Sequence, residues 1–175
     1  MSGLDNNWIR GFAPLISQDS RVLILGSMPG IASLKAQAYY AHPRNAFWPI
    51  MSELFDIDAK APYDQRLTAL LNHRIALWDV LYACKRQGSL DSAIQKHSEQ
   101  VNDFEYLFTN YPFISAVYCN GGKAWQSFQR YVQKPLGLHD VEASCLPSTS
   151  PAHARVNFAA KLSAWKVIAD RLRTY

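Results

Sequence analysis

Residues 21–30 read RVLILGSMPG, an apolar run that ends in a turn. Consecutive apolar residues closed by a glycine are typical of a strand buried on both faces, as in a parallel sheet. Gly26, Pro29 and Gly30 interrupt that strand and open a loop. Parallel sheets bind ligands beyond the C-terminal ends of their strands, so this loop is the first expected place for function.

The same pattern recurs along the chain. Further strands are predicted over residues 75–81, 113–119 and 141–146, and helices over 48–55, 64–72, 103–110, 123–131 and 155–172. The polar residues 83–100 predict a surface loop with a short helix. Residues 33–48 are expected to be irregular, because Pro43 blocks a continuous helix. Alternating strands and helices predict an α/β fold, with a mostly parallel four-stranded sheet covered on both faces, in one domain over residues 1–175.

Composition removes several classes of protein. With 175 residues, 49% of them hydrophobic and 18% charged, the chain can bury a core, which excludes disorder as its main state. It has no run of 18 apolar residues and no signal-peptide pattern, so we expect a cytoplasmic protein away from membranes. Cys84, Cys119 and Cys145 lie far apart, which disfavours disulfides, a structural zinc and an iron–sulfur cluster. The net charge of +4 is compatible with a nucleic-acid partner but decides nothing alone.

The loop GSMPG, residues 26–30, could bring backbone N–H groups to a phosphate or to an acceptor on a base. It lacks the Lys-Ser/Thr of a phosphate-binding loop and does not match the nucleophile elbow GxSxG. The alternative is a plain turn from strand to loop. Its candidate binding residues are Gly26, Ser27, Met28, Pro29 and Gly30.

The segment YYAHPRNAFW, residues 39–48, combines flat rings with polar edges. Planar ligands could stack on its aromatic side chains, which are Tyr39, Tyr40, Phe47 and Trp48. His42, Arg44 and Asn45 could form hydrogen bonds at the same place. The alternative is a surface loop held by aromatic anchors, with His42 merely hydrogen-bonded.

Three further features follow the other strands. Asn120 stands at a strand end, where it could either contact a ligand or cap the next helix. Asp79 is the one acid in an apolar run, and it either caps nearby backbone amides or faces the cleft, because an unpaired buried carboxylate is costly. The segment PSTSPAHAR, residues 147–155, suits contact with a phosphate backbone, or alternatively caps the last helix.

These segments together resemble a known family. In order along residues 26–154, GSMPGIASL, YYAHPRNAFW, ALWDVL, CNGGKAW and STSPAHA closely resemble the hypoxanthine-DNA glycosylase family of the uracil-DNA glycosylase superfamily. The resemblance implies a three-layer α/β/α sandwich. It also implies a monofunctional DNA glycosylase of base excision repair, which flips a deaminated base out of DNA and hydrolyses its N-glycosidic bond, with hypoxanthine in deoxyinosine as the expected base.

The resemblance also implies roles for single residues. In many relatives the first loop supplies an Asp or Asn that positions water, whereas this loop offers only Ser27 and Met28. The family's catalytic amide maps to Asn45, with His42 as a possible donor to the base. Ser148 stands where the superfamily usually has His, and no bulky apolar residue follows at the position of its wedge, which stays unassigned. These departures weaken the expectation of uracil excision.

The expected base pocket extends over the first loop, the aromatic segment and two strand ends. Its members are Gly26, Ser27, Met28, Pro29, Gly30, Tyr39, Tyr40, Phe47, Trp48, Asp79 and Asn120. The expected contacts with DNA are Arg44, Lys85, Arg86, Lys123, Ser148, Thr149, Ser150, Pro151, His153 and Arg155. We expect no cofactor, no metal and no obligate protein partner, and a monomer that binds damaged DNA. The alternatives are a protein that binds damaged or single-stranded DNA without catalysis, a glycosylase for uracil, xanthine or ethenoadenine, and an enzyme acting on free nucleosides or nucleotides.

Overall fold

The computed structural model describes residues 7–175. Its main sheet has four parallel strands in the order β3-β2-β6-β7. They are β2 (Val22–Gly26), β3 (Ile75–Asp79), β6 (Ala116–Asn120) and β7 (Glu142–Leu146). The chain passes from β2 to β3 on one side and then returns to β6 on the other. The crevice expected for a ligand therefore lies at the C-terminal end of β2.

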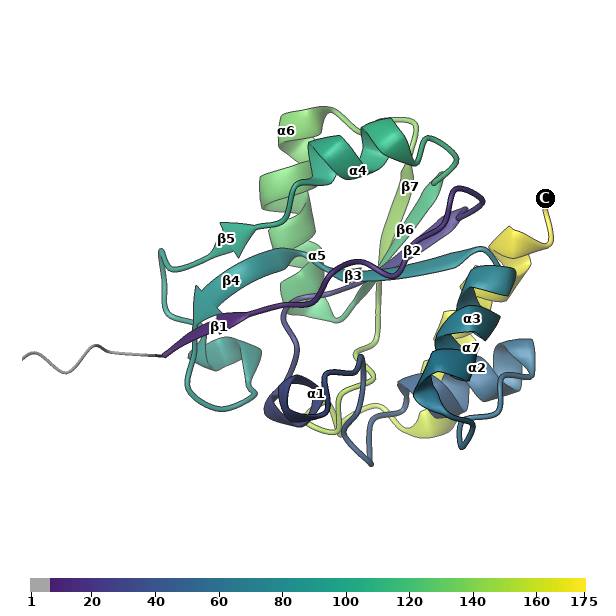
Figure 1. The fold of residues 1–175 in the computed structure, drawn as a ribbon, viewed down its shortest axis with the longest axis horizontal. Helices are drawn as coiled ribbons and strands as arrows, with labels where there is room; N and C mark the ends of the chain where they lie inside the picture. The colour runs from purple at the N-terminus through teal and green to yellow at the C-terminus, as the bar shows by residue number, and fades with distance from the viewer. Residues whose placement is uncertain (1–6) are drawn as a thin grey trace, which may run out of the picture.

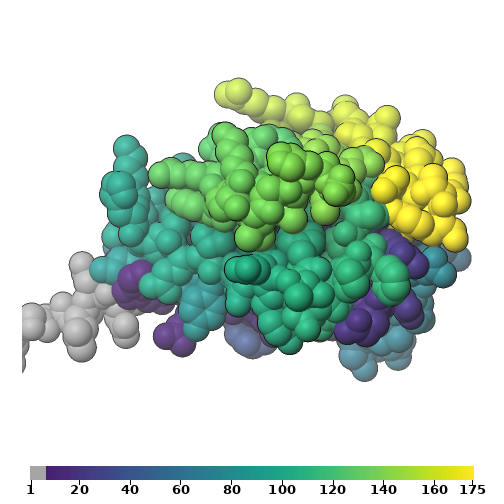
Figure 2. Space-filling model, turned by 90° about the horizontal axis from the view of Figure 1, so that it is seen from above, coloured from purple at the N-terminus to yellow at the C-terminus, as the bar shows by residue number. Residues whose placement is uncertain are grey.

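Helices cover both faces of this sheet (Figure 1). One face carries α2 (Phe47–Phe55), α3 (Tyr63–Asn72) and α7 (Phe158–Leu172). The other carries α4 (Phe104–Asn110), α5 (Gly122–Phe128) and α6 (Lys134–Leu136), the last two joined by the π-helical turn η2 (Gln129–Gln133). Figure 2 shows this second face, where α4 and the η2–α6 region lie side by side. The predicted three-layer α/β/α arrangement is confirmed.

The strands are buried on both faces because alternate residues enter two separate cores. Ile24 and Leu77 pack with the fully buried Trp165 on the side of α2 and α7. Leu25 and Trp78 pack on the opposite side, against α4 and α5. Continuous apolar runs are the pattern that a doubly covered parallel strand requires.

A second, antiparallel sheet was not predicted. It has the order β1-β4-β5, formed by β1 (Trp8–Arg10), β4 (Leu81–Lys85) and β5 (Gln100–Val101). The strand predicted over 75–81 ends at Asp79, and at Val80 the chain turns into β4. The prediction of loop plus short helix for residues 83–100 was therefore only partly right, with η1 (Asp91–Ala93) as its helical turn.

The segment after the first loop is also more regular than predicted. Residues Ile31–Ala36 form the short helix α1, which ends at Gln37 in the left-handed region, with φ of 50°. The irregular segment is thus confined to residues 37–46. It lies at the edge of the sheet where the strands end (Figure 1).

The three cysteines are free thiols, buried at Cys84 and Cys119 and exposed at Cys145. Within residues 7–175, no group of three or more His, Cys, Asp or Glu side chains is arranged to hold a metal ion. Over the same residues, no helix is both long and apolar enough to cross a membrane.

Candidate active site

A cavity of about 420 Å³ lies at the C-terminal ends of three strands of the main sheet. Gly26, Asp79 and Asn120, the last residues of β2, β3 and β6, all line it. The loops lining it are residues 27–33, 39–45, 89–91 and 148–152. A cavity of this size is in the range of small-ligand sites. Three of these four loops belong to segments that the sequence predicts to be functional; the exception is residues 89–91.

The first loop, Gly26–Gly30, is held by its carbonyl groups. The Leu81 N–H donates to Ser27 O over 3.1 Å, and the Arg86 guanidinium donates to Pro29 O. Gly26 is required for a steric reason, because a Cβ atom there would lie 2.3 Å from Asp79 Oδ1. Gly26 and Asp79 are partners in the parallel pairing of β2 and β3. The Asp79 carboxyl therefore occupies the space that a larger residue at position 26 would fill.

Asp79 is an unusual acid for such a position. It is 5% exposed, and its Oδ2 is buried without a hydrogen-bond partner among the described residues. Burial raises the pKa of Asp79 to about 7; the negative charge of Asp91 acts in the same direction, and Arg86 partly opposes it. Of the two predicted alternatives, the structure supports the one in which Asp79 faces the cleft.

Tyr40 forms a second buried polar group beside Asp79. Its backbone has φ of 56°, a left-handed conformation that is rare for a bulky residue and that turns the side chain inward. The ring stacks on Phe47 with centroids 3.9 Å apart, and the hydroxyl has no partner among the described residues. Burial, with the nearby Asp79, raises the pKa of Tyr40, so the phenol keeps its proton.

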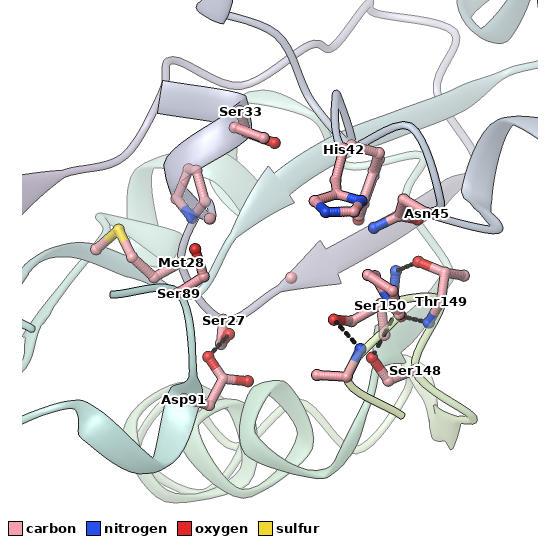
Figure 3. Close-up of a pocket in the computed structure, with 18 of the residues that line it drawn as sticks. Ser27, Met28, Ser33, His42, Asn45, Ser89, Asp91, Ser148, Thr149 and Ser150 are labelled. Carbon is pink, nitrogen blue, oxygen red and sulfur yellow. Dashed lines mark hydrogen bonds between the residues drawn. The ribbon is translucent and has the colours of Figure 1, made fainter. Parts of the chain in front are cut away.

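His42 and Asn45 point into the cavity from the same wall (Figure 3). Asn45 Oδ1 accepts a hydrogen bond from the Phe47 N–H over 2.9 Å, which leaves the NH₂ group free for the cavity. His42 Nδ1 accepts from the Arg44 N–H over 3.1 Å. A neutral imidazole with an accepting Nδ1 carries its proton on Nε2 and donates from there. This wall therefore presents hydrogen-bond donors.

Thr149 joins the loops on two sides of the cavity. Asn120 Nδ2 donates to Thr149 Oγ1, and the Thr149 N–H donates to Asn120 Oδ1, each over 2.9 Å. The Ala46 N–H donates to Thr149 O over 3.0 Å. Asn120 thus lines the cavity, but its amide mainly holds residues 148–152 in place. It does not cap α5, whose N-cap residue is Gly121.

The loop with Ser89, Leu90 and Asp91 forms a wall that the sequence reasoning missed. The Ser27 hydroxyl donates to Asp91 Oδ1 over 2.6 Å (Figure 3), and the Ile31 N–H donates to Ser89 Oγ over 2.9 Å. Burial of its carboxyl group raises the pKa of Asp91, whereas the bond from Ser27 lowers it. The only signal in the sequence was the turn residues Gly88 and Ser89, and these say nothing about a partner 64 positions away.

Two aromatic residues predicted for the base pocket belong to the core instead. Phe47 is 0% exposed and Trp48 is 5% exposed, and neither lines the cavity. Phe47 packs against Trp165 of α7 and Trp48 against Tyr63 of α3, so their prediction as stacking rings was wrong. Tyr39 does line the cavity, but its ring packs edge-on against Phe12 and its hydroxyl donates to Ala13 O.

The predicted contact of Arg86 with DNA was also wrong. Arg86 is 3% exposed, and its guanidinium donates to the carbonyls of Gly88 and Pro29. A side chain that is buried and bonded to the backbone holds two loops together and cannot reach a phosphate.

Of the other basic residues predicted to contact DNA, some lie at or near the cavity and others lie away from it. Lys123 forms an ion pair with Glu99 and Lys85 lies over the ring of Trp8, and neither residue lines the cavity. Arg44 is exposed at the cavity wall. His153 and Arg155 follow the wall residues Ser148, Thr149, Ser150 and Pro151.

Comparison with known proteins agrees with this geometry. The sequence model of the Uracil DNA glycosylase superfamily matches residues 13–171. The chain belongs to this superfamily. The match includes every segment that lines the cavity.

Similar proteins are found in two Methanosarcina species. A protein named hypoxanthine DNA glycosylase from Methanosarcina barkeri is 34% identical over 157 residues, which is 89% of this chain and 94% of that protein. One of the same name from Methanosarcina acetivorans is 35% identical over 147 residues, 83% of this chain and 89% of that protein. A solution NMR structure of a candidate uracil DNA glycosylase from M. acetivorans has a TM-score of 0.80 at 32% identity, covering 95% of this chain and 99% of that one.

Proposed function

We propose that this protein is a monofunctional DNA glycosylase that removes hypoxanthine from deoxyinosine in DNA, the first step of base excision repair. The observation that carries the proposal is the cavity at the strand ends, lined by His42, Asn45 and Asp79. Membership of the superfamily and the names of two similar proteins support it. A base inside the double helix cannot reach such a cavity, so the nucleotide must first swing out of the stack.

The reaction breaks the bond between C1′ of the sugar and N9 of the base. The departing base takes the bonding electrons, while water adds to C1′ and gives up a proton that balances the charge on the base. Positive charge develops on the sugar and negative charge on the base as the bond stretches. Donors directed at the base therefore stabilise the transition state more than the ground state.

His42 is proposed as one such donor. Its Nδ1 is held by the Arg44 N–H, so the neutral ring presents Nε2–H to the cavity. A single oriented donor of this kind contributes about 2.7–4 kcal/mol to the stabilisation of a developing anion.

Asn45 is proposed to position the attacking water. Because Oδ1 is engaged by the Phe47 N–H, the NH₂ group is the part that faces the cavity. It can donate to one lone pair of a water molecule and leave the other lone pair for attack on C1′. A neutral amide is a poor base, so this role is one of orientation.

The test is release of base from an oligonucleotide that contains one deoxyinosine. Purified protein in excess should produce abasic sites, seen as strand breaks after alkali, and mass spectrometry should detect free hypoxanthine. Asn45→Ala should slow release by at least about tenfold, since an oriented hydrogen bond is lost. Parallel substrates with uracil, xanthine and ethenoadenine define the range of bases.

Binding without release would contradict the proposal. It would support a sensor of damaged or single-stranded DNA that uses the same cavity. Faster reaction with free deoxyinosine than with the oligonucleotide would instead indicate an enzyme of nucleosides.

A further inference from the structure

The small antiparallel sheet carries a cluster of aromatic and basic side chains that does not line the cavity. On β1, Trp8 and Arg10 are exposed, whereas the residue between them packs against the core. On β4, Tyr82 is exposed and Lys85 is half-buried, whereas the two residues between them are buried. These four side chains therefore share the outer side of the sheet, and we call them the β1–β4 patch.

Each aromatic ring of the patch has a cation beside it. Lys85 Nζ lies 5.6 Å from the centroid of the Trp8 ring, and the two residues are register partners in the antiparallel pairing of β1 and β4. The central guanidinium carbon of Arg10 lies 5.7 Å from the centroid of the Tyr82 ring. Trp8 is 42% exposed and Tyr82 is 43% exposed, so both rings keep open surface beside these contacts.

Among the described residues, no acid neutralises the charge of the patch. Neither Arg10 nor Lys85 forms an ion pair with a carboxylate within residues 7–175. The Lys85 carbonyl accepts a hydrogen bond from the loop that carries the exposed Lys96, which adds a further positive charge nearby. Glu99, at the end of this loop, is already bound by Lys123 of α5. The patch therefore fits an anionic partner.

Rings interleaved with cations are the pattern that binds single-stranded nucleic acid. Every base has a flat face that stacks on an aromatic ring, and the phosphates between bases attract Lys and Arg. In a double helix the faces of the bases are covered by their neighbours, so rings on the surface of a sheet do not reach them. The rings of the patch therefore favour a single strand over a duplex.

The patch lies within reach of a strand bound at the cavity. Lys85 stands six positions after Asp79, which separates the two by at most about 20 Å at about 3.4 Å per residue. The Gly11 N–H donates to Tyr82 O over 2.9 Å, and a Cβ atom at Gly11 would lie 3.7 Å from Pro29 Cδ of the first loop. The small sheet therefore adjoins the cavity loop, on the side of the molecule away from α2, α3 and α7 (Figure 1).

We propose that the β1–β4 patch binds single-stranded DNA that flanks the nucleotide in the cavity, with bases stacked on Trp8 and Tyr82 and phosphates at Arg10 and Lys85. This inference assigns a second DNA-binding surface and so goes beyond the proposed reaction. It rests on the proposed function for the choice of DNA as the nucleic acid. A single strand that is long enough to reach both sites gains affinity from the patch.

Binding of an undamaged strand tests the patch without any release of base. We would measure the fluorescence anisotropy of a labelled oligothymidylate of about 16 nucleotides. Trp8→Ala and Tyr82→Ala should each weaken binding by at least about fivefold, because one stacked base is lost. Trp8→Phe keeps a ring and should bind within about threefold of the wild type. The matched control is Tyr106→Ala, at an exposed ring on α4, which should leave binding unchanged.

Two further measurements report on the patch itself. Of the five tryptophans, all of which the structure describes, Trp8 alone is exposed. A base stacked on it should quench tryptophan fluorescence when the oligothymidylate is added, and this quenching should be absent in Trp8→Ala. Arg10→Gln and Lys85→Gln should each reduce the slope of log K against log salt by about 0.7, the value for one phosphate of a single strand.

On deoxyinosine substrates the patch should act through binding and not through chemistry. Trp8→Ala should raise KM for a single strand of about 16 nucleotides by at least about fivefold, with kcat within about twofold of the wild type. A strand of about four nucleotides is too short to reach the patch, so its KM should not change.

Equal binding of oligothymidylate by the wild type, Trp8→Ala and Tyr82→Ala would overturn the inference. So would an equal loss by these variants on a duplex of the same length, or tighter binding of oligouridylate than of oligothymidylate by the wild type. If an alanine variant melts well below the wild type, the salt slopes decide, and unchanged slopes in both Arg10→Gln and Lys85→Gln refute the patch. A wild-type protein that binds the strand through the patch but releases no hypoxanthine refutes the proposed function instead.

Discussion

Asp79→Asn should make the protein more stable relative to the wild type, by an amount that grows as the pH rises from about 4 to about 7. The pKa of this carboxyl is raised by burial from its ordinary 3.8 to about 7. In the unfolded chain Asp79 ionises near pH 4, whereas in the folded protein it keeps its proton until about pH 7. The stability that this group contributes is therefore fully present below about pH 4 and is lost as the pH approaches 7.

The magnitude follows from the size of the pKa change. About three pKa units at about 1.4 kcal/mol each correspond to roughly 4 kcal/mol over the whole range, of which roughly 3 kcal/mol falls between about pH 4.5 and 7.5. In a chain of this length, that difference should move the Tm of Asp79→Asn upward relative to the wild type by roughly 6–12 °C between these two pH values.

Thermal and urea unfolding of both proteins at several pH values measure this difference directly. Other titrating groups affect both proteins alike, so only the difference between them is interpreted, and the fixed effect of the substitution appears as a constant offset. A difference that stays constant from about pH 4.5 to 7.5 would show that Asp79 ionises in the folded protein as it does in the unfolded chain. The reasoning about a neutral buried acid would then fail.

Three other substitutions test the geometry of the cavity. Gly26→Ala places a Cβ atom 2.3 Å from Asp79 Oδ1 and should reduce release of base by at least about tenfold. The control Gly122→Ala has open space around its Cβ and should leave release unchanged. Equal rates for the two variants would contradict this steric argument. Asp91→Asn keeps an acceptor for the Ser27 hydroxyl, so its Tm should stay within about 2 °C of the wild type. Asp91→Ala removes this acceptor and should lower the Tm by more. Identical melting curves would show that the hydrogen bond from Ser27 does not hold the loop of Asp91. Asn45→Asp keeps the oxygen that accepts from the Phe47 N–H at the start of α2 but loses the NH₂ group. It should therefore fold normally and release base at least about tenfold more slowly. Full activity would exclude the amide as the group that positions water.

The main sheet could be predicted because its strands follow a simple rule. Residues 22–25 and 75–78 are buried on both faces, and a doubly covered strand has to be apolar throughout. The small antiparallel sheet could not be predicted in this way. Its strand Leu81–Lys85 continues directly from an apolar run, so no change of composition marks the boundary at Val80.

The burial of Phe47 and Trp48 could have been predicted from the sequence. Phe47 and Trp48 stand with Ile50 and Met51 at the spacing of a helix face, and all four are buried in α2. Helical periodicity predicts that such residues pack inward. They were assigned to the binding pocket because they directly follow the irregular segment that carries Tyr39 and Tyr40.

Contacts between distant loops lie beyond any reading of local pattern. Ser27 and Asp91 are 64 positions apart, and their hydrogen bond depends on where the connection between β4 and β5 of the second sheet lies against the first loop. Arg86 was misinterpreted for the same reason. A basic residue in a polar segment usually faces solvent, but the connection that follows β4 buries this one against the carbonyl of Pro29.

The chemistry of the cavity is tied to the register of two strands. Gly26 and Asp79 are paired residues of β2 and β3, and the carboxyl fits only because its partner has no side chain. A shift of that register by one residue would place Leu25 or Ser27 opposite the acid, and either side chain would compete for the space that the carboxyl occupies. The parallel pairing that buries the sheet therefore also sets the position of the acid that lines the cavity. For this reason, variants that shift the pairing at these strand ends should lose activity before they lose the fold.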